Sequence, residues 1–270
     1  MSEDKANNCY RGRLAPTPSG FLHKGHIQTF RKAWERARDA QGSIVLRIDD
    51  LDSGRCTNEY YDACIQDIKG MGLEWDEGPD VGGDYGPYVQ SLRKEKYIKY
   101  VQQLCRKGLI YPCTKTRKEI RDFGLSNRKG DEFLFPQSFR PGKLSWDINR
   151  FSASMNWRFR TSWGQQVLLK DEKVGDKELT VGEDFSDFLV WRKEGIASYE
   201  LATVVDDIQM KITEVVRGED LLISSARQLL LFKVFGQILP TFFHCDLLLG
   251  LDGKKLSKST RSLPRLFSHS

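Results

Sequence analysis

Two short segments that lie far apart along the chain carry side chains suited to nucleotide chemistry. The histidine segment reads His23-Lys24-Gly25-His26, and the lysine segment runs from Lys254 through Lys255, Leu256, Ser257 and Lys258 to Ser259. A nucleoside triphosphate that loses pyrophosphate needs hydrogen-bond donors fixed at the start of a helix and cations beside the leaving group. The first segment meets the former need and the second meets the latter. Each segment alone is equally typical of a helix cap or a basic surface turn, so their joint occurrence carries the interpretation of one ATP site.

The residues around the histidine segment predict a strand, a helix and a second strand. We expect a strand over residues 10–14 that ends before Pro16, because proline cannot continue it. Apolar residues then recur at helical spacing from Gly25 until Gly42, and residues 44–48 form a buried strand. Such a unit belongs to a parallel sheet, whose ligands bind beyond the carboxyl ends of the strands. The loop before the helix and the acidic cluster after the second strand should therefore face one cleft.

The whole chain predicts an α/β fold with a Rossmann-like parallel-sheet core and a smaller inserted subdomain. Periodicity is poor between residue 111 and about residue 174, where Gly, Pro and aromatic residues are frequent. The elements expected outside the insert are helices over 59–71 and 91–107, strands over 202–205 and 213–216, and a helix over 226–236 capped by Ser225, after which residues 247–249 lead to the lysine segment. We therefore divide the chain into a first half of the core (residues 1–110), a basic inserted subdomain (111–175) and a second half of the core with the lysine segment (176–270).

Composition limits the class of protein. A chain of 270 residues with 39% hydrophobic content can bury one sizeable core. No apolar run approaches the roughly 18 to 20 residues needed to cross a bilayer, and the chain opens on polar residues without a signal segment. The six cysteines show no C-x-x-C spacing and no dense framework, which favours reduced, mostly buried thiols. We expect a cytoplasmic, monomeric protein with no membrane partner.

Positive charge is concentrated in the predicted insert. Between Cys113 and Arg160 there are eleven Lys or Arg residues and five Asp or Glu residues, whereas the remainder of the chain is about neutral. Aromatic residues interleave with these cations at Phe133, Phe135, Phe139, Trp146 and Trp157. This combination favours a surface that binds RNA, because cations attract phosphates and aromatic rings stack on bases. A solvated, loop-rich surface is the alternative interpretation.

Six segments together resemble the catalytic core of class I glutamyl-tRNA synthetases. These segments are Arg13–Gly20, His23–His26, Arg47–Asp52, Val204–Asp207, Val216–Asp220 and Lys255–Ser259. Their order and spacing cover most of the chain, which makes the resemblance more specific than any one motif. It implies activation of glutamate to glutamyl-adenylate with ATP and Mg²⁺, followed by transfer of the glutamyl group to RNA.

The resemblance also implies roles for particular residues. The residues that match the family's ATP-binding signatures HIGH and KMSKS are His23, Gly25, His26, Lys255, Leu256, Ser257 and Lys258, of which His23, His26, Lys255 and Lys258 would be catalytic. The residues at the positions that hold glutamate are Arg13, Ser19, Asp49, Tyr199 and Arg217. These types suit the ligand, because an arginine can hold a carboxylate in bidentate fashion while a carboxylate and a hydroxyl receive an ammonium group.

The distance from the lysine segment to the end of the sequence favours one branch of this family. Only residues 260–270 follow, so we expect no anticodon-binding domain. Glutamyl-queuosine tRNA(Asp) synthetases have this plan and attach glutamate to the queuosine base of tRNA(Asp), which would then be the partner here. The alternatives are a freestanding catalytic core that charges the 3′ end of a tRNA, and a derivative that binds RNA or an amino acid without catalysis.

The chain departs from the family at three places. Lys24 replaces an apolar residue of HIGH and would add a cation near the phosphates, and Asp49 replaces a glutamate and shortens the reach to an ammonium by one methylene. The family's zinc site in the insert keeps only Cys113. One thiol cannot hold tetrahedral zinc, so we expect no metal site there and expect Phe135 and Phe139 to fill the space.

Overall fold

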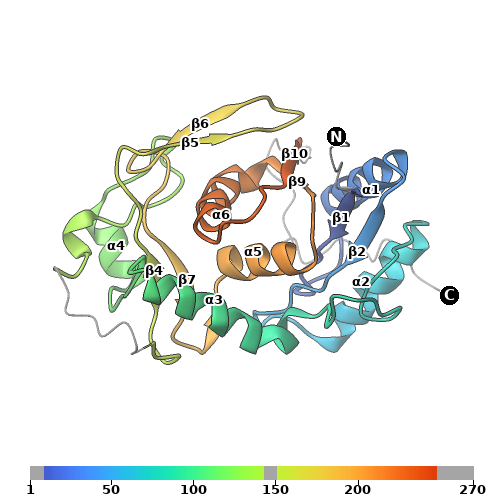
Figure 1. Ribbon diagram of the computed structural model, residues 1–270, viewed down its shortest axis with the longest axis horizontal. Helices are drawn as coiled ribbons and strands as arrows, with labels where there is room; N and C mark the ends of the chain where they lie inside the picture. Colours follow the sequence, from blue (N-terminus) through green and yellow to red (C-terminus); the bar gives the residue numbers. More distant parts are fainter. Residues whose placement is uncertain (1–8, 143–150, 248–270) are drawn as a thin grey trace, which may run out of the picture.

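A layer of parallel strands supports the site in the computed structural model, which describes residues 9–142 and 151–247 (Figure 1). Its strands are β1 (Arg11–Leu14), β2 (Ser43–Leu46), β9 (Glu214–Gly218) and β10 (Thr241–Cys245). Strand β1 runs parallel to β2, and β9 runs parallel to β10. The two pairs meet where the Thr213 amide donates to the Arg11 carbonyl oxygen at 2.9 Å. The strands predicted over residues 10–14, 44–48 and 213–216 are thus confirmed.

Helix α1 (Lys24–Asp39) connects β1 to β2, as predicted. Phe30 and Ala37 are buried in one hydrophobic cluster with residues of both strands, which explains the helical spacing of the apolar residues. The return to β2 requires a glycine at position 42. A Cβ atom on Gly42 would lie 2.4 Å from the carbonyl oxygen of Tyr10, so any larger residue would push the strand away.

The two helices predicted next are also present. They are α2 (Asn58–Gly70) and α3 (Lys94–Arg106), the latter preceded by the 3₁₀ turn η1 (Gln90–Arg93). Thr57 caps α2, because its hydroxyl oxygen accepts from the Tyr60 amide. Among the helices that the structure describes, none combines the length and the apolar character needed to cross a bilayer.

The strand predicted over residues 202–205 is wrong, because this segment is helical. It lies within α5 (Tyr199–Gln209), which Ser198 caps by accepting from the Leu201 amide. A short apolar run rich in valine has the same pattern in a buried strand and in a buried helix. Helix α5 is of the buried kind and packs against α3 and α6 in the middle of the molecule (Figure 1).

Helix α6 (Leu222–Val234) starts earlier than predicted, and Ser225 is not its cap. The 3₁₀ turn η3 (Glu219–Leu221) leads directly into the helix, so no side-chain cap is present. Ser225 instead lies inside the helix, where its hydroxyl is 3.0 Å from the Leu221 carbonyl oxygen.

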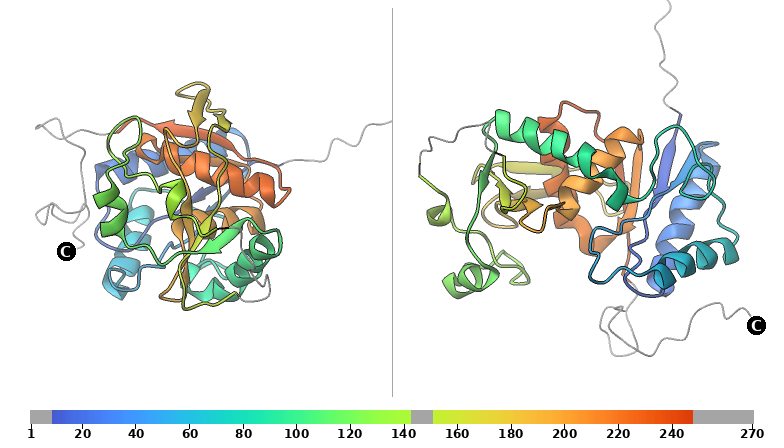
Figure 2. Two further views of the ribbon diagram at one scale, coloured as in Figure 1. Left: turned by 90° about the vertical axis from the view of Figure 1, so that its left-hand side faces the viewer. Right: turned by 90° about the horizontal axis from the view of Figure 1, so that it is seen from below.

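The middle of the chain forms an antiparallel sheet beside the parallel layer. The sheet has the order β3 (Ile110–Pro112), β4 (Trp157–Phe159), β7 (Phe188–Arg192) and β8 (Ile196–Ala197), with α4 (Arg117–Phe123) and the turn η2 (Gln137–Phe139) at its end. The hairpin β5 (Gln166–Leu169) and β6 (Lys177–Thr180) extends from it, as Figure 2 shows from two further sides. This sheet takes strands from both sides of residue 175, and the domain division remains a prediction.

Aromatic side chains pack the end of this sheet, as predicted. Phe135 is 2% exposed and clusters with Tyr111, Cys113 and Ile120, and Phe139 packs against the cluster. The Phe135 and Phe139 rings meet edge to face, with centroids 5.9 Å apart. Within the described part of the chain no three His, Cys, Asp or Glu residues are grouped as metal ligands. The expectation that the protein carries no zinc remains a prediction.

Phe135→Ala should lower the free energy of unfolding by about 3 kcal/mol or more, because a buried ring is replaced by a cavity. Phe133→Ala is the matched control, since Phe133 lies two residues away and is 44% exposed. Urea denaturation followed by tryptophan fluorescence measures both. Equal losses in the two variants would show that the cluster does not hold the insert together.

Candidate active site

One cavity of about 560 Å³ brings together most of the predicted site residues. The predicted residues on its wall are Arg13, His23, Gly25, His26, Asp49, Tyr199 and Arg217. They come from the ends of β1, β2 and β9 and from the starts of α1 and α5, as expected for a ligand site at the carboxyl ends of parallel strands. Ser19 and Lys24 are not on this wall, and Lys255, Leu256, Ser257 and Lys258 lie outside the described residues. The roles of all these residues remain predictions.

The two histidines are built into the cap of helix α1. The Nδ1 atom of His23 accepts from the Gly25 amide at 3.2 Å, and the Nδ1 atom of His26 accepts from the His23 amide at 3.3 Å. The rings stack with centroids 3.7 Å apart. Gly25 leaves room for this arrangement, because a Cβ atom there would lie 3.1 Å from the His23 ring. Lys24 is exposed and is not among the residues that line the cavity, and its expected role near the phosphates remains a prediction.

These contacts determine where each neutral imidazole carries its proton. Because both Nδ1 atoms accept hydrogen bonds, the proton of each neutral ring must be on Nε2. Each ring can therefore act as a hydrogen-bond donor. Together with the positive end of the α1 dipole, the histidines make the start of this helix favourable for phosphate.

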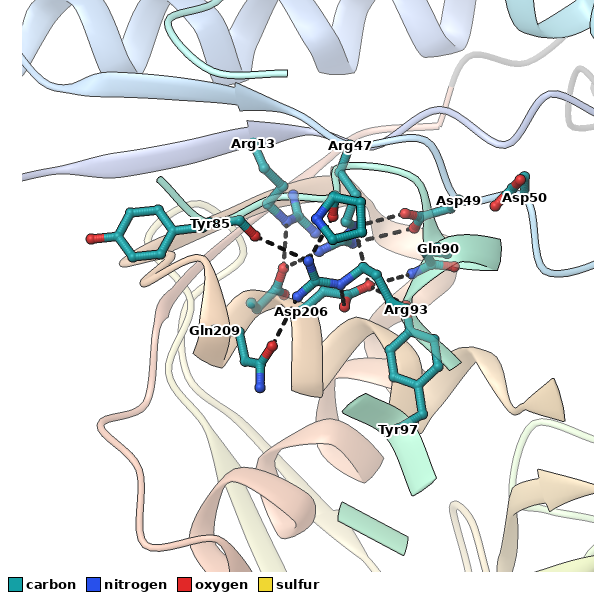
Figure 3. A network of polar contacts seen from close by, with 12 residues as sticks. Arg13, Arg47, Asp49, Asp50, Tyr85, Gln90, Arg93, Tyr97, Asp206 and Gln209 are labelled. Carbon is teal, nitrogen blue, oxygen red and sulfur yellow. Dashed lines mark hydrogen bonds and ion pairs between the residues drawn. The ribbon is translucent and has the colours of Figure 1, made fainter. Parts of the chain in front are cut away.

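A buried cluster of arginines and aspartates underlies the cavity (Figure 3). Arg47 is fully buried and donates to Asp49 at 2.7 Å and 3.2 Å and to Asp207 at 2.6 Å. Arg93 donates to Asp206 at 2.6 Å. The same aspartate accepts from the Gln90 amide group and the Tyr97 hydroxyl, both at 2.9 Å. These partners were not predicted from the sequence. The feature that could have indicated them is the acidic pair Asp206-Asp207 directly after an apolar run, because buried carboxylates require cations nearby.

The position of Asp49 limits how it can serve a ligand. Both of its carboxylate oxygens accept from Arg47, so the guanidinium of Arg47 already balances its negative charge. Burial raises the pKa of Asp49 to about 6 in spite of these hydrogen bonds. Arg47 also lines the cavity, so a ligand ammonium group would meet this ion pair and not an isolated carboxylate.

Arg13 and Arg217 both line the cavity, but their guanidinium groups have different partners inside the protein. Arg13 donates to the Val216 carbonyl oxygen at 2.9 Å, and its Nε atom lies 3.6 Å from a carboxylate oxygen of Asp207. Arg217 donates to the side-chain oxygen of Gln228 at 2.5 Å. Its Nε and Nη1 atoms are buried and have no hydrogen-bond partner among the described residues. Tyr199, which is 41% exposed, stands on the wall of the same cavity.

A serine, a histidine and an aspartate form a buried chain behind Arg217. The Nδ1 atom of His244 lies 2.5 Å from a carboxylate oxygen of Asp171, and its Nε2 atom lies 2.7 Å from the Ser225 hydroxyl. This order resembles that of a hydrolase triad. However, His244 and Ser225 are fully buried and do not line the cavity, so no substrate can reach the serine. These hydrogen bonds are structural and connect the loop that joins β5 to β6 with β10.

His244 should give the stability of the fold a pH dependence of known sign. Burial, followed by the charge of Arg217, lowers the pKa of His244 from 6.5 to about 4. The unfolded chain binds a proton at this side chain below pH 6.5, whereas the folded chain resists protonation until about pH 4. The free energy of unfolding should therefore fall by roughly 3 kcal/mol across this window because of His244.

His244→Gln removes this titration and is the comparison variant. Urea denaturation between pH 7 and pH 4 should give a steeper loss of stability in the wild-type protein than in the variant. Parallel profiles would mean that His244 does not resist protonation in the folded chain.

Comparison with known proteins agrees with this geometry. Residues 10–267 match the family model described as the catalytic domain of class I tRNA synthetases (E and Q). The chain is 39% identical over 255 residues to the glutamyl-Q tRNA(Asp) synthetase of Nitratidesulfovibrio vulgaris, covering 94% of this chain and 79% of that protein. It is 35% identical to the glutamate–tRNA ligase of Sulfurihydrogenibium sp., covering 92% of this chain and 52% of the ligase.

A solved structure shows the same fold. The glutamate–tRNA synthetase of Elizabethkingia anophelis superposes with a TM-score of 0.79 at 29% identity, covering 93% of this chain and 52% of that one. The chain thus spans about half the length of the full synthetase. The predicted Rossmann-like fold is confirmed as that of a class I aminoacyl-tRNA synthetase. The chain belongs to the family of class I synthetases for glutamate and glutamine, and it is a ligase with the catalytic domain of that family.

Proposed function

We propose that this protein activates glutamate with ATP and transfers it to the queuosine base of tRNA(Asp). The observation that carries the proposal is a single cavity with a phosphate-binding helix start on one wall and the arginine and tyrosine side chains on another. The chain is 39% identical to the proteins named glutamyl-Q tRNA(Asp) synthetase from Nitratidesulfovibrio vulgaris and Symbiobacterium thermophilum. The cytoplasmic location and the monomeric state expected from the sequence stay predictions.

Glutamate activation in this cavity would rest on positioning and charge stabilisation. The α-carboxylate attacks the α-phosphate of ATP, a bond to that phosphorus breaks, and pyrophosphate leaves. The imidazole N–H groups of His23 and His26 would donate to phosphate oxygens, and Arg217 would hold a carboxylate of glutamate. No protein nucleophile is needed, because the substrate carboxylate is itself the attacking group.

Mg²⁺ would enter this cavity with the triphosphate. It is usually held by phosphate oxygens and one or two carboxylates, and Asp220 and Asp246 supply carboxylates on the cavity wall. The ion would neutralise charge that develops on the phosphates. Asp246 also pairs with Lys173, which places a cation close to the same edge.

The basic insert is the part of the chain that we expect to contact RNA. A second cavity of about 590 Å³ lies between the insert and β7, and its cationic wall residues are Lys115, Arg117 and Arg158 of the insert and Arg192 and Lys193 beyond it. Glu194 is the acidic residue on this wall. The Arg158 side chain is held in place, because it donates to the Cys113 sulfur at 3.3 Å and stacks over the Phe135 ring. Such a fixed cationic surface suits an RNA backbone.

The purified protein should catalyse ATP–pyrophosphate exchange that depends on glutamate and needs no RNA. The resemblance to the queuosine enzymes implies this, whereas relatives that charge tRNA(Glu) generally need RNA for activation. Labelled glutamate should then be transferred to tRNA(Asp) that contains queuosine and not to the same tRNA without it. A folded protein without any exchange would leave only a binding role.

The position of the glutamyl group distinguishes the acceptor. Periodate oxidises the 3′-terminal diol of a tRNA unless an ester protects it. Transfer to the base should leave that terminus open to oxidation, whereas charging of the 3′ end would protect it. Protection of the terminus, or transfer without queuosine, would support the alternative of a freestanding core that charges a 3′ end.

Lys258→Ala should slow adenylate formation by about 10²-fold if this lysine stabilises the leaving pyrophosphate. Thr260→Ala is a neighbouring control outside the signature. Single-turnover formation of glutamyl-adenylate measures the effect, and thermal unfolding checks that the fold is intact. A change of less than about twofold would remove Lys258 from the proposed catalytic set.

A further inference from the structure

Arg217 is the cavity arginine whose charge is left uncompensated. Arg13 and Arg47 both lie within ion-pair distance of Asp207. In the part of the chain that the structure describes, no carboxylate lies within 4.0 Å of the Arg217 guanidinium, although the residue is only 4% exposed. A buried cation in this state attracts a carboxylate ligand strongly, because no internal anion competes with it.

The contact that holds Arg217 is a neutral amide. Gln228 is fully buried on α6, and its Oε1 atom accepts from the Nη2 atom of Arg217 at 2.5 Å. Its Nε2 atom donates to a carboxylate oxygen of Glu200 at 3.0 Å. An arginine has donors only and a carboxylate has acceptors only, so the amide can have just this orientation. Gln228 therefore separates a buried cation from a buried anion by one side chain.

Glu200 is fixed in turn by its own partners. The Ser224 hydroxyl donates to its Oε1 atom at 2.9 Å, and a guanidinium nitrogen of Arg227 lies 3.8 Å from the same atom. The carboxylate thus has contacts on both oxygens. A continuous chain of hydrogen bonds runs from α5 through α6 to the end of β9, and it ends at the cavity wall.

We propose that Gln228, oriented by Glu200, is a positioning residue that makes the cavity selective for a carboxylate substrate. It holds the guanidinium of Arg217 in place without neutralising it, which a carboxylate at the same position would do. The charge of Arg217 then remains available to glutamate. This inference rests on the proposed function and identifies residues that determine which amino acid the cavity accepts.

The sharpest test exchanges the two side chains in the double variant Glu200→Gln/Gln228→Glu. The variant keeps the composition, the volume and the number of buried charges, but it moves the carboxylate onto Arg217. The KM for glutamate in pyrophosphate exchange should rise by about tenfold or more, because the guanidinium is now paired internally. The KM for ATP should stay within about twofold, since the histidine segment is untouched.

Glu200→Gln alone is the matched control, because it keeps an amide against Arg217 and should change the KM for glutamate much less than the double variant does. Gln228→Met is the second variant if the exchange impairs folding, as judged by thermal unfolding. It removes the acceptor at similar volume and should lower kcat/KM for glutamate while leaving the KM for ATP in place.

The outcomes separate this inference from the proposed function. Wild-type protein without glutamate-dependent exchange would contradict the proposed function itself. An active wild type together with an unchanged glutamate KM in the double variant would overturn the positioning role alone. Equal changes in the KM values for glutamate and ATP would also overturn it, because they indicate a general disturbance of the cavity.

Discussion

The ion pairs of fully buried Arg47 constrain the rest of the site. This side chain, at the end of β2, bonds at once to Asp49 in the next loop and to Asp207 on α5. Removing one partner of a buried ion pair costs about 3 to 5 kcal/mol, because the other charge is left unpaired in the protein interior. The cluster therefore holds the first strands of the chain and the central helix at one fixed separation. The cavity lies directly over this junction.

The same pairing determines which charges can meet a ligand. Asp207 is shared by Arg47 and Arg13, so neither cation is wholly available, and Asp49 is tied to Arg47. Of these three arginines, Arg217 is the one without a carboxylate at ion-pair distance in the part of the chain that the structure describes, and a neutral amide holds it. The ion pairs inside the protein thus leave the charge of one cavity arginine, Arg217, available to an incoming carboxylate. Selectivity for glutamate would then arise from the positive charge of Arg217, which no carboxylate of the described core neutralises.

Local patterns predicted the elements that form the cavity wall at the start of α1. The turn, the histidine segment and the helical spacing up to Gly42 lie in one continuous stretch, and their contacts are mostly between near neighbours. The resemblance to a known family placed Arg217 and Tyr199 in the same site. Sequence patterns failed at α5, where a valine-rich run gave no periodicity that separates a helix from a strand.

Contacts between distant residues could not be predicted in this way. Arg93 meets Asp206, and Asp171 meets His244, across stretches in which no repeat or motif links the partners. Gln228 gave no signal at all, because a glutamine inside a helix is ordinary and only the fold shows that it is fully buried. Such residues acquire their roles from the tertiary structure alone.

The helical form of α5 explains how one element serves several parts of the site. About two turns of this helix, roughly 10 Å, separate Glu200 from Asp207. Tyr199 and Glu200 in the first turn reach the cavity and Gln228, and Asp206 and Asp207 in the last turn reach the arginine cluster. A strand in this position would have sent adjacent residues to opposite faces. The helix instead lets neighbouring acidic residues pair with different arginines.

Helix α6 extends this arrangement to the insert. Arg227, adjacent to Gln228, pairs with Glu132 of the insert and also lies 3.8 Å from Glu200. Its guanidinium stands near the ring of Phe185, which precedes β7, and near the ring of Phe188, the first residue of β7. The residue next to the one that holds Arg217 is therefore in direct ionic contact with the basic insert. If the insert binds RNA as proposed, a movement of the insert would act directly on the helix that carries Gln228 and so on the position of Arg217.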